Sequence, residues 1–235
     1  MNLEILPVRT AGAAENMAVD FLMLRRYPRP EVARYRHYEW RGPAFTFGYS
    51  QKFGFVRAQV PADVLDICRR PTGGGLVDHS EDWTYALVIP RAHALWDARA
   101  SECYRAVHEC LAAALAAKSV PAVVKKSAEP ATGGEPAGVC FQQAELFDVM
   151  HASSGVKIAG AAQKRTGQGM LLQGSVWRPA CGGAVDWDAF GEAFESGLAS
   201  LLGAKPAHPG WPEWNEDEET ALTEQYASPE WNEQR

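Results

Sequence analysis

Residues 69–79 read Arg69-Arg70-Pro71-Thr72-Gly73-Gly74-Gly75-Leu76-Val77-Asp78-His79, and the rest of the chain is interpreted from them. Three consecutive glycines add no side chain to a core and lose backbone entropy on folding, so packing does not explain them. They leave backbone N–H groups accessible and permit positive φ angles. Because two arginines precede them and an apolar alternation follows, we predict a strand, a glycine loop and a second strand. The loop is expected to cover a ligand with partial or full negative charge. A plain hairpin turn is the alternative.

The glycine loop fits neither of two widespread phosphate-binding motifs. It has no Gly-Lys-Ser or Gly-Lys-Thr ending, so it is not a P-loop. The Gly-x-Gly-x-x-Gly pattern of dinucleotide-binding folds matches neither its spacing nor its strand–loop–strand context. The sequence therefore predicts a binding site of another kind.

Composition and charge are those of a soluble globular protein. The 235 residues suit one large domain or two small ones, and 46% are hydrophobic while 22% are charged. The net charge of −6, from 23 basic and 29 acidic residues, argues against a nucleic-acid binder that neutralises phosphates. An anionic small ligand is still compatible with this balance.

Nothing in the sequence indicates a targeting segment or a metal site. The N-terminus lacks a basic region followed by an apolar one, and the longest apolar run, 110–117, is too short to cross a bilayer. Five scattered cysteines, without a Cys-x-x-Cys or a His/Cys cluster, indicate reduced thiols and no zinc site. We therefore expect a cytoplasmic protein that binds no metal, nucleic acid or membrane.

The hydrophobic patterns predict an α+β fold. Helical spacing of apolar residues predicts helices over 14–24, from 97 or 101 to 118, and from 186 or 188 to 202, with a short helix over 63–67. Apolar alternation predicts strands over 3–6, 32–40, 44–51, 83–89, 122–124, 146–150, 156–160 and 170–177. Residues 127–138 are predicted to form a loop, and 163–169 a polar turn. Since strands and helices do not alternate regularly, we expect a mixed, mainly antiparallel sheet with flanking helices, in a single domain over 1–235. Residues 206–235 form an acidic extension, either docked or partly ordered.

Lys157 is the first candidate for chemistry. It lies in an apolar strand between Gly155 and Gly160, on the face opposite Val156 and Ile158. An unpaired buried ammonium is costly, so a lysine here is either at a solvated strand edge or functional. The glycines would let a ligand approach, and the charge would polarise a carbonyl or pair with a phosphate.

Cys140 is the second candidate, because it follows a loop, whereas Cys103 and Cys110 lie on a helix and are expected to be buried packing residues. A cysteine nucleophile needs thiolate character, which a nearby Lys157 would favour. An inert thiol is the alternative. His79 could orient a ligand or could be an ordinary hydrogen-bonded histidine.

Four segments resemble the biotin/lipoate protein ligase and octanoyltransferase superfamily. Residues 69–79 resemble its Arg-Arg-x-Ser/Thr-Gly-Gly-Gly-Ala-Val-x-His motif, and 157–163 resemble the Lys-Ile-x-Gly-Ser-Ala-Gln stretch with its signature lysine. Residues 172–175 are similar to its His-Gly-Ser/Thr segment, and 16–20 look like its first helix. The chain differs from these patterns at Ala161, where serine is usual, at Gln173, where histidine is frequent, and at Leu76 and Asp78.

Cys140-Phe141 resembles a Cys-Phe segment of the octanoyltransferases, so within the superfamily the chain looks most similar to these cysteine-dependent enzymes and the lipoate-protein ligase A family. The resemblance implies a catalytic domain like those of biotin ligases and class II aminoacyl-tRNA synthetases, and an acyl group carried as a cysteine thioester. It implies that Cys140 attacks the donor thioester while Lys157 holds the acyl carbonyl. Residues implied to bind substrate are Arg70, Thr72, Gly73, Gly74, Gly75, Val77, His79, Gly160, Gln163 and Gly174.

The implied reaction moves an octanoyl or lipoyl group from an acyl carrier protein to a lysine, without a cofactor. The acceptor would be a lipoyl domain of a 2-oxoacid dehydrogenase or the glycine cleavage H protein.

Two other functions stay open. An ATP-dependent lipoate or biotin ligase would use ATP and Mg, with Arg70 and Lys157 gripping an acyl-adenylate and Cys140 incidental. Such ligases typically lack this cysteine and often carry a C-terminal accessory domain, for which the residues after Leu202 leave no room. The other alternative is a non-catalytic binder of lipoyl or acyl groups.

Overall fold

A mixed, mainly antiparallel sheet forms the centre of the molecule. The computed structural model describes residues 1–25, 29–127, 144–213 and 216–234. Within these residues the sheet has the strand order β12–β1–β3–β7–β11–β10–β9–β8, and β2 also pairs with β3. All pairs from β3 to β8 are antiparallel, while β1 pairs in parallel with β3 and β12. Its strands are β1 (Asn2–Ile5), β2 (Arg9–Ala11), β3 (Val32–Trp40), β7 (Asp82–Pro90), β8 (Ala122–Val124), β9 (Val149–His151), β10 (Lys157–Arg165), β11 (Gly169–Trp177) and β12 (Lys205–Ala207).

Strand β7 is buried along its whole length, which shows that the sheet is covered on both faces. Its Trp83, Tyr85 and Leu87 belong to one hydrophobic core. The intervening Ala86 and Val88 belong to another, because successive side chains of a strand point to opposite faces.

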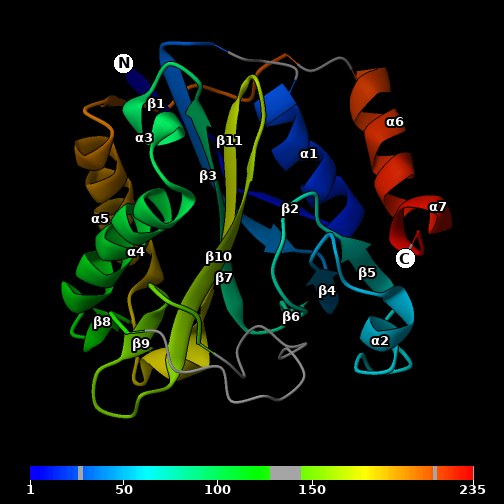
Figure 1. Ribbon diagram of the computed structural model, residues 1–235, viewed down its shortest axis with the longest axis horizontal. Coiled ribbons are helices and arrows are strands. Elements are labelled where there is room, and N and C mark those ends of the chain that lie inside the picture. The colour runs from blue at the N-terminus through cyan, green and yellow to red at the C-terminus, as the bar shows by residue number, and fades with distance from the viewer. Residues whose placement is uncertain (26–28, 128–143, 214–215, 235) are drawn as a thin grey trace.

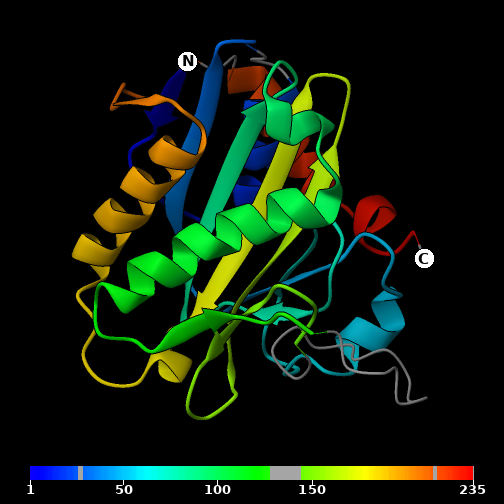
Figure 2. The same cartoon turned by 60° about the vertical axis from the view of Figure 1, so that its left-hand side comes forward.

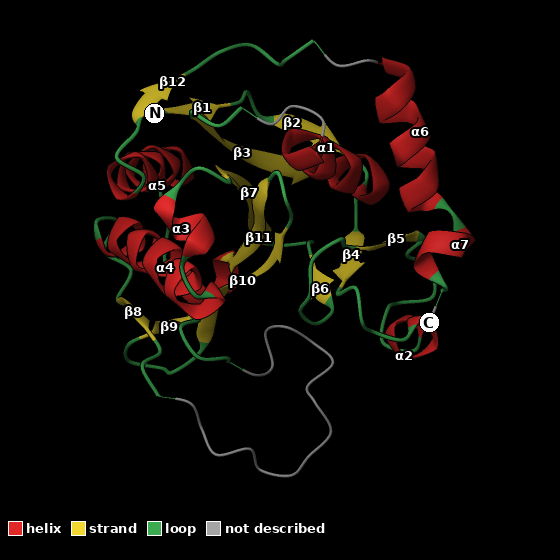
Figure 3. Cartoon of the chain, turned by 45° about the horizontal axis from the view of Figure 1, so that its top comes forward, coloured by secondary structure: helices red, strands yellow, loops and turns green. Residues whose placement is uncertain are grey.

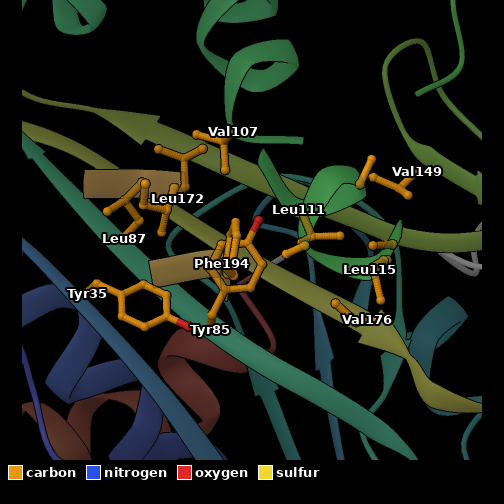
Figure 4. Packing of buried hydrophobic residues seen from close by; sticks show 14 of the residues in the cluster. Tyr35, Tyr85, Leu87, Val107, Leu111, Leu115, Val149, Leu172, Val176 and Phe194 are labelled. Carbon is orange, nitrogen blue, oxygen red and sulfur yellow. The ribbon is translucent and has the colours of Figure 1, made fainter. Parts of the chain in front are cut away.

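Two long helices, α4 and α5, cover one face of the sheet (Figures 1 and 2). In α4, Val107, Leu111 and Leu115 are buried at intervals of four residues, which puts them on one side of the helix. Figure 4 shows these side chains beside Phe194 of α5 and Tyr85 of the sheet. The helices of this part are α3 (Ala94–Asp97), α4 (Ala100–Ala116), α5 (Trp187–Leu201) and the 3-10 turn η1 (Arg178–Cys181).

Helix α1 (Ala13–Arg25) lies on the opposite face, and α6 (Glu216–Ala227) packs on its outer side (Figures 1 and 3). Leu222 and Tyr226 of α6 share a core with Met17 and Leu22 of α1. The described part of the acidic extension is therefore docked, and it ends in the short helix α7 (Pro229–Asn232). Among the described residues, no helix has the length and apolar character of a membrane span.

A second, three-stranded sheet of the described residues lies beside α1 and carries the glycine loop. Its strands are β5 (Asp66–Arg69), β4 (Ala44–Phe47) and β6 (Val77–Asp78), in that spatial order. The predicted strand–loop–strand is confirmed, but β5 and β6 do not form a hairpin. Each pairs with β4 from opposite sides, in parallel and antiparallel respectively, so the loop crosses over the end of β4.

Two local predictions are wrong. Residues 63–67 do not form a helix, and the short helix is α2 (Phe53–Arg57) instead. The Arg57 guanidinium donates to the carbonyl oxygens of Pro61 and Val64, which holds the chain in a turn before β5. Strand β10 extends to Arg165 and β11 begins at Gly169, so the predicted polar turn over 163–169 is shortened to 166–168. Most of the predicted 127–138 loop lies outside the described residues.

Candidate active site

A narrow cavity, which we call the slot, lies between the α1 face of the central sheet and the three-stranded sheet. Its floor is a row of residues paired across four strands, namely Gly160–Ser175, Ser175–Thr84 and Thr84–Tyr38. Its cover comes from Met17 of α1 and from Thr46, Arg70, Gly74 and His79. The slot holds about 420 Å³ of empty space, open solvent at its mouth included. It therefore crosses the sheet from β10 to β3.

Backbone geometry explains the glycine at the centre of the loop. Gly74 has a φ of +88°, a conformation that L side chains rarely adopt. A Cβ on Gly48 would lie 1.9 Å from the Gly74 carbonyl oxygen, so the loop packs directly on the backbone after β4. Gly74 lines the slot.

Arg70 holds the loop in this shape. Its guanidinium donates to the carbonyl oxygens of Gly73 and Gly75 at 2.9 and 2.7 Å, and to Thr46 Oγ1 at 2.8 Å. Arg70 is buried and lines the slot, so it fixes the loop and also places positive charge at the cavity.

Arg69 is not part of the slot, although the sequence pairs it with Arg70. Its backbone N–H donates to Asn232 Oδ1 at 2.7 Å, and its guanidinium donates to the carbonyl oxygens of Asn232 and Trp231. The same guanidinium donates to the carbonyl oxygens of Tyr49 and Gln51. We call the contacts of Arg69 with Trp231 and Asn232 the C-terminal clamp, since they fasten α7 to the strand that enters the glycine loop.

His79 lines the slot with both ring nitrogens engaged by protein. Nδ1 lies 2.6 Å from Asp82 Oδ2, and Nε2 lies 2.7 Å from Thr46 Oγ1. The imidazole stacks on the Trp40 indole with ring centroids 3.9 Å apart. His79 thus forms part of a fixed wall.

Thr72 contacts the slot through Gln173. Its hydroxyl donates to Gln173 Oε1 at 2.7 Å, and Gln173 Nε2 donates to Asp20 Oδ2 at 2.7 Å. Asp20 pairs with Arg36, yet burial raises the pKa of its carboxyl. Because one amide supplies both an acceptor and a donor, Gln173 links the loop to α1.

Lys157 is buried and has an ionic partner that the sequence did not reveal. Its Nζ lies 2.8 Å from Asp148 Oδ2, and Tyr104 donates to Asp148 Oδ1 at 2.5 Å. The ammonium lies 2.9 Å from the point where a Cβ on Gly160 would be, and Gly160 lines the slot. The solvated-edge alternative is therefore wrong, because Lys157 is buried and paired with Asp148.

The face assignment around Lys157 is also corrected. Val156 precedes β10 and is 40% exposed, whereas Ile158 is fully buried. They do not share a face, because the pairing register shifts between Lys157 and Ala159.

Among the remaining predicted residues, Gly73 and Gly75 accept hydrogen bonds from Arg70 and lie outside the slot lining. Val77 and Gly174 line the slot, and Gly174 also accommodates the Tyr85 ring, which would lie 2.3 Å from a Cβ there. Gln163 lies away from the slot lining and donates to the Ala100 carbonyl oxygen at 2.9 Å. Cys140 lies outside the described residues.

The cysteines of the described residues are free thiols. Cys103 is fully buried as predicted, whereas Cys110 is half-buried. Burial raises the pKa of Cys103, Cys110 and Cys181 to about 11, so these thiols are protonated near neutral pH. The described residues contain no group of three or more His, Cys, Asp or Glu side chains that could hold a metal ion.

The mixed α+β fold of this chain matches the fold of solved lipoate-protein ligases. A chain from the structure of lipoate-protein ligase A bound with ATP has a TM-score of 0.72 at 18% identity, covering 99% of both chains. A chain from the structure of a bi-partite lipoate protein ligase and its E2 lipoyl domain from Thermoplasma acidophilum also gives 0.72 at 18% identity. That match covers 99% of this chain and 96% of the other.

The chain belongs to the lipoyl protein ligase A/B catalytic domain family, whose model matches residues 12–179. Octanoyltransferase LipM of Symbiobacterium thermophilum is 33% identical over 181 residues, which are 74% of this chain and 65% of that protein. Octanoyltransferase LipM of Bacillus cereus is 32% identical over 170 residues, 68% of this chain and 59% of that protein. The chain thus spans less than two thirds of the length of these relatives. The resemblance drawn from the motifs is confirmed.

Proposed function

We propose that this protein transfers an octanoyl or lipoyl group from a carrier-protein thioester to a lysine of a lipoyl domain. Its family and the octanoyltransferase relatives support this function. The slot supports it as well, because a narrow cavity with Met17, Tyr38 and Val77 in its lining suits an acyl chain.

The observation that carries the proposal is the place of the Lys157 ammonium at the Gly160 end of the slot. An acyl chain in the slot with its carbonyl at this end has a positive charge beside the oxygen that becomes negative during acyl transfer. Fixed donors at such a position stabilise the transition state. Asp148 and Tyr104 keep the ammonium in place.

Cys140 is the proposed nucleophile. Its thiolate attacks the carbonyl carbon of the donor thioester, the bond from that carbon to the carrier sulfur breaks, and the carrier thiolate leaves and takes up a proton. The neutral amine of the acceptor lysine then attacks the Cys140 thioester. An amide forms, the cysteine sulfur leaves, and the proton lost by the amine balances the restored thiol. This route requires no ATP.

The other predicted residues receive positional roles in the proposal. Arg70 shapes the glycine loop through the carbonyl groups of Gly73 and Gly75, Gly74 contributes to the cover, and Thr72 ties the loop to Gln173 of β11. Gly160 leaves room for the Lys157 ammonium, while Val77, His79 and Gly174 complete the slot. Gln163 bonds β10 to the start of α4 and does not contact the acyl chain in the proposal.

The decisive experiment is intact-mass analysis after mixing the protein with an octanoylated acyl carrier protein. We expect an octanoyl adduct that Cys140→Ser abolishes and that Cys110→Ser, a thiol at the groove between α4 and α5, leaves at the wild-type level. Transfer to a lipoyl domain should fall at least a hundredfold in Cys140→Ser. An undiminished adduct in Cys140→Ser contradicts the covalent route.

A second assay separates the transferase from an ATP-dependent ligase. The protein is mixed with lipoate, ATP, Mg and labelled pyrophosphate. Lipoate-dependent exchange would mean that an acyl-adenylate forms and would exclude the proposed route. Binding of octanoate without any transfer would identify a non-catalytic binder.

A further inference from the structure

Phe147 has a backbone conformation that few residues other than glycine adopt. Its φ angle is +71°, and in the described part of the chain Ser119, at +64°, is the one other non-glycine residue with a positive φ. A bulky side chain in this left-handed region strains the backbone, so neighbouring contacts must hold it there. Phe147 directly precedes Asp148, the ionic partner of Lys157.

This strained residue is the first residue of a β-bulge just before β9. The Phe147 N–H donates to the Lys125 carbonyl oxygen, and the Lys125 N–H donates to the Asp148 carbonyl oxygen, both at 2.9 Å. Two residues of one strand therefore oppose a single residue of the other, next to the regular pair of Val124 and Val149. In such a bulge glycine commonly occupies the left-handed position, and the extra residue redirects the side chain that follows. Asp148, which follows here, is fully buried.

His108 of α4 binds the carbonyl group of Phe147. The imidazole Nδ1 lies 2.7 Å from that oxygen, and because a carbonyl oxygen only accepts, Nδ1 carries the proton. His108 is fully buried, and its ring packs against the Tyr104 ring with centroids 4.1 Å apart, so it has a fixed place on the helix. Since the carbonyl belongs to the planar peptide unit that enters Asp148, the imidazole fixes the orientation of that unit.

One face of α4 therefore supports both the bulge and the carboxylate that follows it. Tyr104 and His108 are four residues apart, which places them on the same side of the helix. Tyr104 donates to Asp148 Oδ1 at 2.5 Å, and Asp148 Oδ2 lies 2.8 Å from Lys157 Nζ. If Phe147 left the left-handed region, the peptide unit entering Asp148 would turn, and the carboxylate would lose this alignment.

We infer that His108 is a positioning residue of the transfer reaction. It holds Phe147 in the left-handed conformation, and this backbone shape aims Asp148 at Lys157. The inference rests on the proposed function and deepens it, because it names the group that keeps the ammonium at the acyl carbonyl. His108 lies outside the slot lining and acts through the backbone.

A double-mutant cycle in octanoyl transfer tests this role. His108→Leu removes the donor, so kcat should fall at least tenfold while KM for the octanoyl donor changes less than twofold. Phe147→Gly removes the strain, and its kcat should stay within threefold of wild type. Adding His108→Leu to Phe147→Gly should then lower kcat less than threefold. A merely structural histidine would cause the same loss in both backgrounds, and that result would overturn the inference.

His108→Asn and Ser119→Gly are the matched controls. Asparagine presents an N–H close to the position of histidine Nδ1, so His108→Asn should keep kcat within threefold of wild type. Ser119→Gly relieves the other positive-φ residue, and in that background His108→Leu should still lower kcat at least tenfold. Rescue by Ser119→Gly would mean that any relief of strain compensates the loss, which would also overturn the inference.

Two measurements without transfer separate this inference from the proposed function. If wild type transfers no octanoyl group, the proposed function fails, and these measurements alone decide how Asp148 is placed. Nitrogen NMR of wild type at pH 7 requires no variant and should show a neutral His108 protonated at Nδ1. A proton on Nε2 would leave the Phe147 carbonyl without its donor and overturn the inference.

The second measurement is a crystal structure of His108→Leu. Phe147 should leave the left-handed region, and the distance from Lys157 Nζ to Asp148 Oδ2 should exceed about 4 Å, the limit of an ion pair. If that distance stays at the wild-type 2.8 Å, His108 does not position the carboxylate.

Discussion

Two buried ion pairs of the described residues determine which single-residue variants are informative. The Arg36–Asp20 pair is fully buried, and the side chains of Lys157 and Asp148 are 5% and 1% exposed. Removing one partner of a buried pair costs about 3–5 kcal/mol, because the other charge is left without compensation. Truncation of Lys157 would therefore lower both stability and transfer activity, and the two effects could not be told apart. Lys157→Arg keeps the charge and separates the two.

His108, next to this cluster, gives a pH prediction. Its Nδ1 lies 2.7 Å from the Phe147 carbonyl oxygen, and its buried Nε2 has no partner among the described residues. Burial lowers the pKa of His108 to about 4, while an unfolded histidine titrates near 6.5. Between these values the unfolded state binds more protons, so stability falls as pH falls from about 6.5 to about 4. We expect His108 to contribute a loss of about 2–3 kcal/mol in unfolding free energy between pH 7 and pH 4.

Urea denaturation across this pH range checks the expectation. His108→Gln should flatten the pH dependence by that amount, whereas His208→Asn, at an exposed position, should keep the wild-type curve. A His108→Gln curve with the wild-type slope would contradict the assignment.

At the scale of elements, the glycine loop depends on the backbone it packs against. Gly48 follows β4 and meets the Gly74 carbonyl oxygen, so a Cβ at position 48 must displace the loop. We expect Gly48→Ala to raise KM for the octanoyl donor at least tenfold and to lower the unfolding free energy by about 1–3 kcal/mol. Steady-state kinetics and urea denaturation measure the two effects.

Gly42→Ala is the matched control, since a Cβ there meets nothing within 4 Å. It should change stability by less than about 0.5 kcal/mol and leave KM unchanged. A Gly48→Ala variant that behaves like Gly42→Ala would mean that the loop moves aside without affecting the slot.

Elements with strong periodicity were predictable from sequence, and contacts between distant elements were not. The apolar alternation over 83–89 predicted β7, and helical spacing of apolar residues predicted α1, α4 and α5, because both patterns are local. The loop motif indicated Gly74 and Arg70 at the slot. By contrast, nothing local marks Asp148 as the partner of Lys157. The structural role of Arg69 was not predictable either, because its partner Asn232 lies 163 positions away in the chain.

At the scale of the whole molecule, the C-terminal clamp joins a residue inside the segment that the family model matches to residues beyond that segment. The matched segment ends at residue 179, yet α7 beyond it holds the strand that enters the glycine loop. The Trp231 indole donates to the Arg69 carbonyl oxygen at 2.8 Å, so both backbone groups of Arg69 are bound by the extension. The extension therefore supports the slot, although none of its described residues belongs to the slot lining.

Asn232→Ala tests this support. The variant leaves the buried Arg69 N–H without its acceptor, which costs about 1–3 kcal/mol. We expect a loss of that size in urea denaturation and faster proteolytic cleavage in the glycine loop. Gln234→Ala, which removes an exposed contact to the Trp231 carbonyl oxygen, should change neither. Equal protease resistance in both variants would show that the loop is stable without the clamp.

The clamp also bears on how the protein matures during synthesis. Arg69 leaves the ribosome 163 residues before Asn232. At about 5–20 residues per second, roughly 10–30 s pass between the synthesis of Arg69 and that of Asn232. The strand that enters the glycine loop is therefore fastened only after α7 has been translated, and a ribosome stalled in α6 would display a nearly complete sheet with an unsecured loop.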